Sequence, residues 1–503
     1  DGASRVISGA VTAGNPLIDF NGADNVTIDG LFTGEYALTI VNTTVSSTTN
    51  TSTVRFQNDA VNNSITRCKI LGSSTTALGT NGGNIIFGTG PATGNDNNTI
   101  SNCDIGPAGT NLPSKCIFFT GSTTTAVRNN SGDTIRDCNI YDFFNNSNHS
   151  SGIYIEAGAT NVLIRNNRFF QTSPRVLTTT SLHTAISIEN TGGNDFQIIG
   201  NIIGYGNSDG KGVYTVSGGA SNTFRAININ VGTTLASGIQ GNTIDGISHS
   251  TADAGTGTFS PCVMIFIRNG LVETGNVSGN IIGGLSGRGR ITFSSSSTGV
   301  SHVIGLANFG ASNWKCENNS IGGITVSNSS TGTANFYGIL ANMADSDTLF
   351  CEDNIIGGDD SASIQSTTPT NSSQVVGIVC DNPPGSITGN VIKNLVSGGG
   401  TGINESSSLI GISIKNSGSS AGLYVTNNKI TGLRNISPSL ASNVSGIYNG
   451  ASTGTNVISG NLVYMLLAES YSATINGILS EGGSTTFYNN MINLGEGYWV
   501  HLN

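Results

Sequence analysis

Two pairs of titratable side chains recur one repeat apart and could carry acid–base chemistry. Glu156 and Glu189 each end a stretch of alternating apolar residues, and His149 and His183 stand just before the same two stretches. On neighbouring strands the two carboxylates would lie about 5 Å apart, the spacing found in retaining glycosidases, and imidazoles beside carboxylates can also hold a divalent metal. The alternative is that all four side chains are solvated on an exposed strand. The four are therefore candidates only, and the sequence assigns neither a catalytic residue nor a metal ligand.

The stretches that carry these residues recur along the chain as Gly or Ala followed by alternating apolar residues. Residues 152–155, 185–188, 226–229 and 411–414 are clear examples. Alternation with period two marks a strand with one buried face. The outward side chains of these strands should form a mostly polar row. The predicted outward row consists of Tyr154, Glu156, Ser187, Glu189, Asn228, Asn230, Phe266, Arg268, Leu340, Asn342, Val379, Asp381, Ser413, Lys415, Tyr448, Leu479 and Glu481.

A second pattern, apolar-x-x-Asn-x-apolar, follows most of these stretches. Its two apolar ends are five residues apart, so an unbroken strand would point them to opposite faces. A bend is therefore expected just before the Asn, at residues that tolerate a left-handed backbone: Asn166, Gly200, Gly241, Gly279, Asn318, Gly389, Asn427, Gly460 and Asn489. The Asn then faces inward, and stacked amides can pass hydrogen bonds from coil to coil. The predicted ladder comprises Cys68, Cys103, Cys138, Asn167, Asn201, Asn242, Asn280, Asn319, Asn354, Asn390, Asn428, Asn461 and Asn490.

These patterns predict an all-β fold, a single-stranded right-handed parallel β-helix (solenoid) with three strands in each coil. The repeat length gives about 14 coils of about 35 residues and a rod of about 65 to 70 Å. Long loops rich in Ser, Thr and Gly follow the third strand. No shift in composition marks a boundary, so residues 1–503 are expected to form one continuous domain. Neither end carries a capping pattern, which suggests a segment of a longer chain.

Composition narrows the function classes. Charged residues make up 10% of the chain and the net charge is −10, which argues against nucleic acid as a partner, because such binders need clustered Lys and Arg. No apolar run is long enough for a membrane span, and the first residues lack the features of a signal peptide. We expect a protein without a membrane span that is extracellular or at the cell surface.

The eight cysteines are too sparse for a disulfide scaffold in 503 residues. Cys68, Cys103 and Cys138 stand 35 residues apart, and Cys316 and Cys351 repeat that interval. Cysteines stacked in register would be separated by about the strand spacing of 4.8 Å, wider than the roughly 3.8 Å between the Cβ atoms of a disulfide. We therefore interpret them as small buried apolar residues.

The combined pattern resembles the parallel β-helix repeat of the pectate-lyase-like superfold, in which an asparagine ladder lines one turn, and the likeness covers about residues 18–492. The stretch 96–106, Asp-Asn-Asn-Thr-Ile-Ser-Asn-Cys-Asp-Ile-Gly, also resembles long cell-surface repeat proteins of Bacteroidota that are exported by type nine secretion. The first resemblance implies enzymes that work on the outward face of the first strand. The second resemblance implies a location at the cell surface and no particular activity.

The catalytic motifs of that superfold are largely missing. Of the polygalacturonase motifs only Asp359-Asp360 occurs, in a predicted long loop. Pectate lyases need carboxylates around Ca²⁺ and a catalytic Arg, whereas Arg268 is expected two coils from Glu189. No cofactor is expected, although an acidic cluster could bind Ca²⁺: Asp345, Asp347, Glu352 and Asp353.

Two further sites follow from short motifs. Thr348 and Ser361 lie in Asp-Ser/Thr-apolar triplets, which resemble the O-glycosylation signal of Bacteroidota. The leading hypothesis for the whole chain is a non-catalytic extracellular rod, an adhesin stalk or fibre segment. Its loops would contact a surface, a glycan or a neighbouring copy, and its ends could associate end to end. The alternative is a carbohydrate-active enzyme, a polysaccharide lyase or glycoside hydrolase, acting on the first-strand groove.

Overall fold

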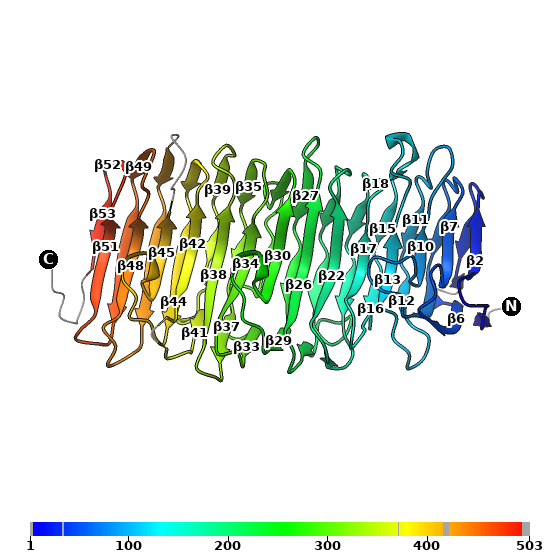
Figure 1. The fold of residues 1–503 in the computed structure, drawn as a ribbon, viewed down its shortest axis with the longest axis horizontal. Coiled ribbons are helices and arrows are strands. Elements are labelled where there is room, and N and C mark those ends of the chain that lie inside the picture. The colour runs from blue at the N-terminus through cyan, green and yellow to red at the C-terminus, as the bar shows by residue number, and fades with distance from the viewer. Residues whose placement is uncertain (1–3, 33–34, 371, 416–421, 495–503) are drawn as a thin grey trace. The chain divides into compact units, whose positions relative to one another are not determined.

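The computed structural model describes residues 4–32, 35–370, 372–415 and 422–494. The chain divides into two compact units, Asp1–Gly246 and Ile247–Asn503. Each is a stack of parallel coils with three strands per coil, coloured from blue to green in the first unit and from green to red in the second (Figure 1). The predicted all-β parallel β-solenoid fold is confirmed. In the described part of the chain, no helix is long and apolar enough to cross a membrane.

The first unit contains three parallel sheets. The first sheet is formed by β2 (Pro16–Asn21), β7 (Ser52–Gln57), β10 (Ile85–Phe87), β13 (Lys115–Phe119), β17 (Ser150–Ile155), β22 (Ser181–Asn190) and β26 (Asn222–Val231). The second is formed by β3 (Thr27–Asp29), β8 (Ser64–Thr66), β11 (Thr99–Ser101), β15 (Thr134–Arg136), β19 (Leu163–Arg165), β23 (Gln197–Ile199) and β27 (Ser237–Gln240). The third contains β1 (Arg5–Gly9), β6 (Leu38–Ser46), β9 (Cys68–Ser74), β12 (Asp104–Pro107), β16 (Asn139–Tyr141), β20 (Arg168–Phe170), β24 (Ile202–Gly204) and β28 (Thr243–Asp245).

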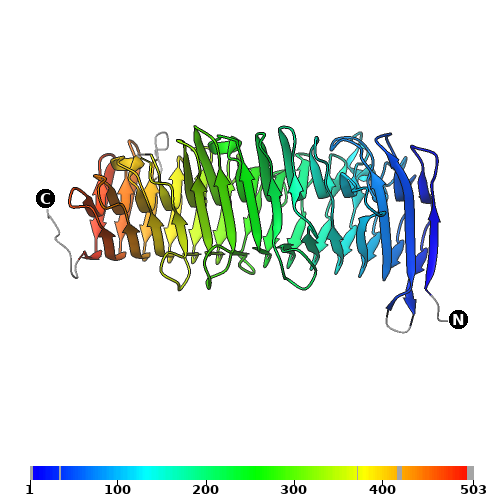
Figure 2. The same ribbon diagram turned by 90° about the horizontal axis from the view of Figure 1, so that it is seen from below.

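The first unit also contains short strands in addition to the three main strands of each coil. β21 (Arg175–Val176) pairs with β25 (Tyr214–Ser217), and β14 (Asn130–Ser131) pairs with β18 (Ala159–Thr160). The hairpin of β4 (Leu31–Phe32) and β5 (Glu35–Tyr36) is antiparallel, and Figure 2 shows it projecting from the coils.

The second unit repeats the plan. Its first sheet is β30 (Cys262–Asn269), β34 (Val300–Asn308), β38 (Thr333–Asn342), β42 (Val375–Asp381), β45 (Leu409–Ile414), β48 (Asn443–Asn449) and β51 (Thr474–Ser480). Its second is β31 (Val272–Thr274), β35 (Trp314–Glu317), β39 (Leu349–Glu352), β43 (Gly385–Thr388), β46 (Leu423–Thr426), β49 (Thr455–Ser459) and β52 (Ser484–Tyr488). Its third joins β32 (Ile281–Ile282), β36 (Ser320–Ile321), β40 (Ile355–Ile356), β44 (Val391–Ser397), β47 (Lys429–Asn435), β50 (Leu462–Ala468) and β53 (Met491–Asn493), together with β29 (Ile247–Thr251), β33 (Ile291–Ser295), β37 (Ile324–Asn328) and β41 (Ile364–Ser366).

Residues of the same type stack in register in the core. In the first unit Phe20, Phe56, Phe87 and Phe119 follow one another, with ring centroids 4.7, 4.8 and 4.0 Å apart. The spacing matches the distance between neighbouring strands. Every ring therefore covers the apolar face of the next coil, which no single coil could bury alone.

The corner before each inward Asn has the expected backbone. Asn166, Asn318, Asn427 and Asn489 have φ between 54° and 58°, and Gly200, Gly241, Gly389 and Gly460 also have positive φ. Gly279 is the exception, since its φ is not positive. Asp353 occupies the same corner with φ 53°, which shows that Asp also fills this position.

Candidate functional site

In the first unit, hydrogen bonds join the asparagines of successive coils. Asn167 Nδ2 donates to Asn201 Oδ1, and Asn201 Nδ2 donates to Asn242 Oδ1, each over 3.0 Å. Each Nδ2 also donates to a carbonyl of the coil before it, as from Asn167 to Ile135 O over 2.9 Å. The Asn167 backbone N–H donates to the same Asn201 oxygen. One amide thus contacts both neighbouring coils.

The second unit contains a longer run of the same contact. Nδ2-to-Oδ1 hydrogen bonds of 2.9 to 3.0 Å join consecutive members of the series Asn280, Asn319, Asn354, Asn390, Asn428, Asn461 and Asn490. All are buried except Asn490, in the last coil, which is half-buried. We call this series the asparagine column.

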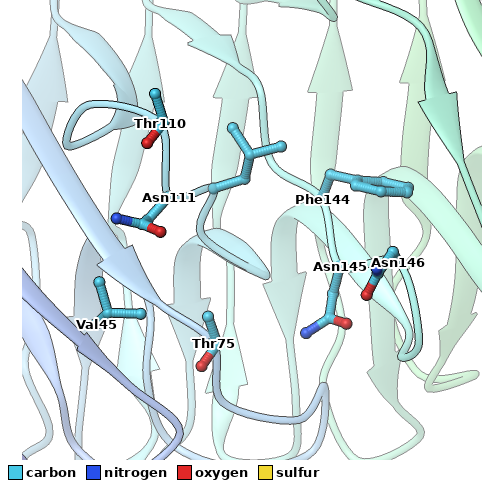
Figure 3. A pocket seen from close by; sticks show the side chains of 8 residues that line it. Val45, Thr75, Thr110, Asn111, Phe144, Asn145 and Asn146 are labelled. Carbon is cyan, nitrogen blue, oxygen red and sulfur yellow. The ribbon is translucent and has the colours of Figure 1, made fainter.

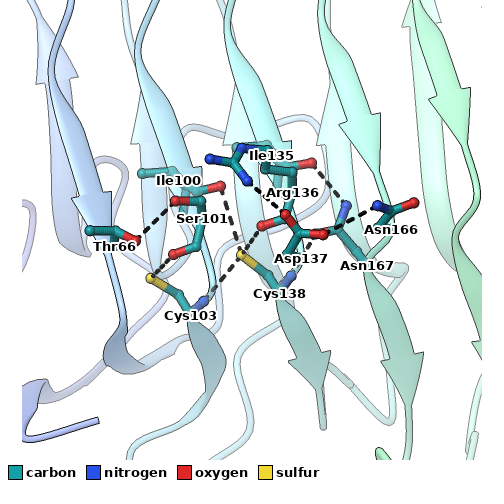
Figure 4. A network of polar contacts seen from close by, with 10 residues as sticks. All are labelled: Thr66, Ile100, Ser101, Cys103, Ile135, Arg136, Asp137, Cys138, Asn166 and Asn167. Carbon is teal, nitrogen blue, oxygen red and sulfur yellow. Dashed lines mark hydrogen bonds and ion pairs between the residues drawn. The ribbon is translucent and has the colours of Figure 1, made fainter. Parts of the chain in front are cut away.

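Thiols take the equivalent position in the coils before Asn167. The Cys103 N–H donates to Cys138 Sγ over 3.4 Å, and the Cys138 N–H donates to Asn167 Oδ1 over 3.0 Å (Figure 4). All eight cysteines are free and buried, as the spacing argument predicted. Burial raises the pKa of Cys68 to about 12. The thiols of Cys103 and Cys138 are therefore hydrogen-bonded parts of the interior.

Glu156 and Glu189 lie at equivalent positions, because Ile155 pairs with Ile188. Their surroundings differ. Glu189 accepts hydrogen bonds from Asn228 Nδ2 over 2.8 Å and from Asn230 Nδ2 over 2.9 Å. Burial raises the pKa of Glu156, and the charge of Lys115 opposes that rise.

The two histidines occupy different environments. On the neighbouring strand His183 pairs with Ser150 and not with His149. The two histidines are therefore offset by one residue in the register of the sheet. His183 is fully buried, with Nδ1 2.7 Å from Ser150 Oγ and Nε2 2.6 Å from Tyr214 OH. His149 is exposed. The structure therefore does not bring both imidazoles to the two carboxylates.

Lys115 is a functional candidate that the sequence patterns did not identify. Its ammonium donates to the carbonyl oxygens of Ala77, Leu78 and Thr80 over 2.5, 2.8 and 2.6 Å. It also lies 4.6 Å from the centroid of the Phe118 ring. The side chain is buried, and burial lowers its pKa to about 7. The sequence does contain one indication of a buried lysine here, because Lys115 is the only charged residue in the apolar strand Lys115–Phe119.

The predicted outward row is more buried than the sequence suggested. At the first outward position of each strand, Ser187, Asn228, Phe266 and Ser413 are each at most 1% exposed. Residues two positions further on, such as Arg268, are half-buried or exposed. In the second unit, apolar side chains of these strands pack against one another in a buried cluster: Val263, Phe266, Ile304, Ala307, Tyr337, Leu340, Val376, Val379, Ile410 and Tyr448. The side chains at the centres of these strands are thus largely shielded from solvent.

One hollow of about 290 Å³ opens beside this cluster in the second unit. Tyr337 OH donates to Gln374 Oε1 over 2.9 Å at its base, and Lys415 Nζ lies 3.7 Å from Glu405 Oε2 at its edge. Burial raises the pKa of the nearby Asp381, while Lys415 lowers it. The hollow contains polar groups of both charges, but those groups already contact one another.

The proposed ion and glycan sites lie on turns. Within the described ranges, no three His, Cys, Asp or Glu side chains are arranged to hold a metal ion, the acidic cluster around Asp345 included. Thr348 is half-buried, and its backbone N–H donates to Asn313 Oδ1 over 2.8 Å. Ser361 is exposed, and its hydroxyl accepts a hydrogen bond from Arg288 Nη2.

Comparison with known proteins gives no family. No family model matches the sequence, and no curated protein matches it. Among solved structures, the N-terminal fragment of gene product 12 of bacteriophage phi29 aligns with a TM-score of 0.27 and 14% identity over 97% of this chain and 83% of that one. The PL6 family alginate lyase AlyGC aligns with a TM-score of 0.14 and 10% identity over 97% of this chain and all of that one. Neither likeness is close enough to transfer an activity, so function must be argued from the residues.

Proposed function

We propose that this chain is a non-catalytic structural segment of an extracellular fibre or of a cell-surface adhesin stalk. The observation that carries the proposal is the asparagine column, which ties each coil of the second unit to the next through side chains as well as through backbone. Each of these hydrogen bonds contributes about 0.5 to 1.5 kcal/mol net to the contact between two coils. Such a stack suits a protein that must keep its shape outside the cell.

The state of the candidate acids supports the same proposal. A general acid or base must reach a proton of the substrate. Both oxygens of Glu189 already accept hydrogen bonds from asparagines of the next strand. Glu156 is half-buried beside the buried ammonium of Lys115. The Glu189 carboxylate would therefore have to leave its asparagine partners before it could act on a substrate.

The alternative function is a polysaccharide lyase or glycoside hydrolase acting on the first-sheet row. The purified chain would be incubated with alginate, polygalacturonate, xylan and mannan, and new reducing ends and unsaturated products would be measured. We expect no turnover. Turnover that is lost in Glu156→Gln or Glu189→Gln, but kept in the exposed control Thr298→Ala, would replace the structural proposal with the enzymatic one.

The proposed setting is the surface of a bacterium of the Bacteroidota, with export by type nine secretion. Its support is the resemblance of residues 96–106, together with the loops rich in Ser, Thr and Asn, to such proteins. Thr348 and Ser361 are the proposed O-glycosylation sites. Expression in such a host should give glycan-bearing peptides at these two residues by mass spectrometry, and unmodified peptides at both would remove this part of the proposal.

The proposal includes end-to-end self-association. Val6 and Ile7, in the first coil of the first unit, are 62% and 45% exposed, and Phe487 and Ile492, in the last coil of the second, are 45% and 44% exposed. Unpaired strand edges with apolar side chains recruit other strands. Sedimentation velocity should show an average mass that rises with concentration. A strict monomer at every concentration would exclude this association.

A further inference from the structure

The first unit contains a hollow of about 380 Å³ on the side where the third strands end (Figure 3). Its walls come from four successive coils, because they belong to β6 and to the turns that follow β9, β12 and β16. The side chains that matter here are Thr75, Thr110, Asn111, Phe144, Asn145 and Asn146. Several coils thus contribute to one concave surface, as ligand sites on repeat proteins require.

The polar side chains of this hollow have unused hydrogen-bonding capacity. In the described part of the chain, the side chains of Thr75, Thr110, Asn111 and Asn146 make no hydrogen bond. Asn145 is held in place, since its Nδ2 donates to Ser114 Oγ over 3.2 Å and its Oδ1 accepts from the Ser147 N–H over 3.1 Å. Amides and hydroxyls both donate and accept. The hollow therefore offers several free donors and acceptors around one fixed amide.

Phe144 supplies a rigid apolar wall. Its backbone N–H donates to Pro113 O over 2.8 Å, and its ring meets the edge of the buried His183 ring with centroids 5.9 Å apart. Arg175 lies 5.9 Å from the Phe144 ring centroid and is itself fixed by Asp142 and by Gln171. A ring held by buried neighbours loses little entropy when a ligand packs on it.

The absence of charged side chains from the lining favours an uncharged ligand. None of the side chains that line it is ionisable. Arg175, which lies against Phe144, forms an ion pair with Asp142, and both of these side chains are 10% exposed. Amides and hydroxyls around an aromatic face match the hydroxyls and the C–H face of an uncharged sugar ring. Carboxylate and phosphate ligands would find no cation to pair with.

We propose that this hollow binds a sugar unit of a neutral glycan, with Phe144 against the sugar ring and the side chains of Asn111, Asn146 and Thr75 bonded to its hydroxyls. The inference rests on the proposed function, because it gives the structural segment an adhesive contact. It places that contact on the turns after the third strands, away from the first-sheet row.

Binding is tested by isothermal titration calorimetry on the full chain. The probes are cellohexaose, maltohexaose and mannohexaose as neutral oligosaccharides and hexagalacturonate as the acidic one. We expect at least one neutral probe to bind and hexagalacturonate not to bind. If no neutral probe binds at millimolar concentration, or if only hexagalacturonate binds, the proposed ligand class is wrong.

Variants locate the site. Asn111→Ala and Asn146→Ala should each weaken binding of the neutral probe about fivefold, as expected for one lost hydrogen bond, without lowering thermal stability. Phe144→Ala should weaken it more, and Phe144→Leu separates loss of stacking from loss of packing. The exposed control Thr298→Ala, in the other unit, should bind as the parent does. Unchanged affinity in both Asn variants would place the site elsewhere.

The same titrations separate this inference from the proposed function. Hydrolysis or elimination of a bound probe, detected by mass spectrometry, would overturn the non-catalytic function while leaving the binding site in place. Absence of binding would overturn the inference while leaving the structural role intact.

Discussion

Asn354 Nδ2 donates a hydrogen bond to Asn390 Oδ1 over 2.9 Å, and Asn354 Oδ1 accepts one from Asn319 Nδ2 over 3.0 Å. A single buried amide thus joins three successive coils of the second unit. Nδ2 also donates to Cys316 O over 2.8 Å. Because Asn354 is completely buried, water cannot replace any of these contacts when the side chain is removed.

The buried thiols should be inert in the folded protein. All eight cysteines are buried, so a reagent cannot reach them, and burial also raises the pKa of Cys68, Cys116 and Cys380, which keeps these three as thiols at neutral pH. Titration with Ellman's reagent should detect no thiol in the native chain and eight after denaturation in guanidinium. Rapid reaction of any native thiol would contradict the burial of that part of the stack.

His249 should make the protein sensitive to acid. Burial lowers its pKa from 6.5 to about 3, so below pH 6.5 the unfolded chain takes up a proton that the folded chain does not. The free energy of unfolding should then fall by up to about 1.4 kcal/mol for each pH unit below 6.5. Urea melts at pH 7 and pH 5 should show a smaller loss in His249→Phe than in the parent. An equal loss in both would mean that His249 is protonated in the fold.

Lys115 should make the free energy of unfolding depend on pH above neutrality. Burial lowers its pKa from 10.5 to about 7, so between these values the unfolded chain binds the proton more tightly and unfolding becomes harder as the pH rises. We expect the stability of the parent relative to Lys115→Met to increase between pH 7 and pH 9, by up to about 1.4 kcal/mol for each pH unit. The measurement is the difference in free energy of unfolding at the two pH values. A difference that stays constant or shrinks would refute the lowered pKa.

The positions of the strands and corners in each coil could be predicted because the apolar residues and asparagines recur periodically in the sequence. The bend before each inward Asn followed from the parity of the apolar residues, and the positive φ of Asn166 and Gly200 agrees with it. Gly279 has no positive φ, because glycine permits a left-handed backbone without requiring it. Asp353 fills the same corner before Asn354, because Asp also tolerates that conformation.

The candidate sites were less predictable because they depend on loops. The pattern of alternation predicts which side chains point outward, but not that neighbouring residues then bury them, as at Phe266, which packs against Phe309, and at Ser413. The same limit explains Lys115, whose partners are carbonyl groups of a turn in the preceding coil. Carbonyl acceptors carry no sequence signature. The hollow beside Phe144 is likewise formed by turns of several coils.

Two asparagines, one buried and one exposed, allow the contribution of the asparagine column to stability to be measured separately. Asn354 is buried in the column, whereas Asn146 is exposed and its side chain makes no hydrogen bond in the described residues. Asn354→Leu adds a second comparison, because leucine keeps about the same side-chain volume but can neither accept from Asn319 nor donate to Cys316 O and Asn390 Oδ1. It therefore separates loss of hydrogen bonds from loss of volume.

The most direct test of the structural account is the change in free energy of unfolding, from urea melts, of Asn354→Ala beside Asn146→Ala. Removing the Asn354 side chain leaves buried groups unpaired in the neighbouring coils, so we predict a loss of about 1 to 3 kcal/mol for each such group. Asn146→Ala should change stability by no more than about 0.5 kcal/mol. Equal and negligible effects in both variants would contradict the claim that hydrogen-bonded asparagines hold the coils together.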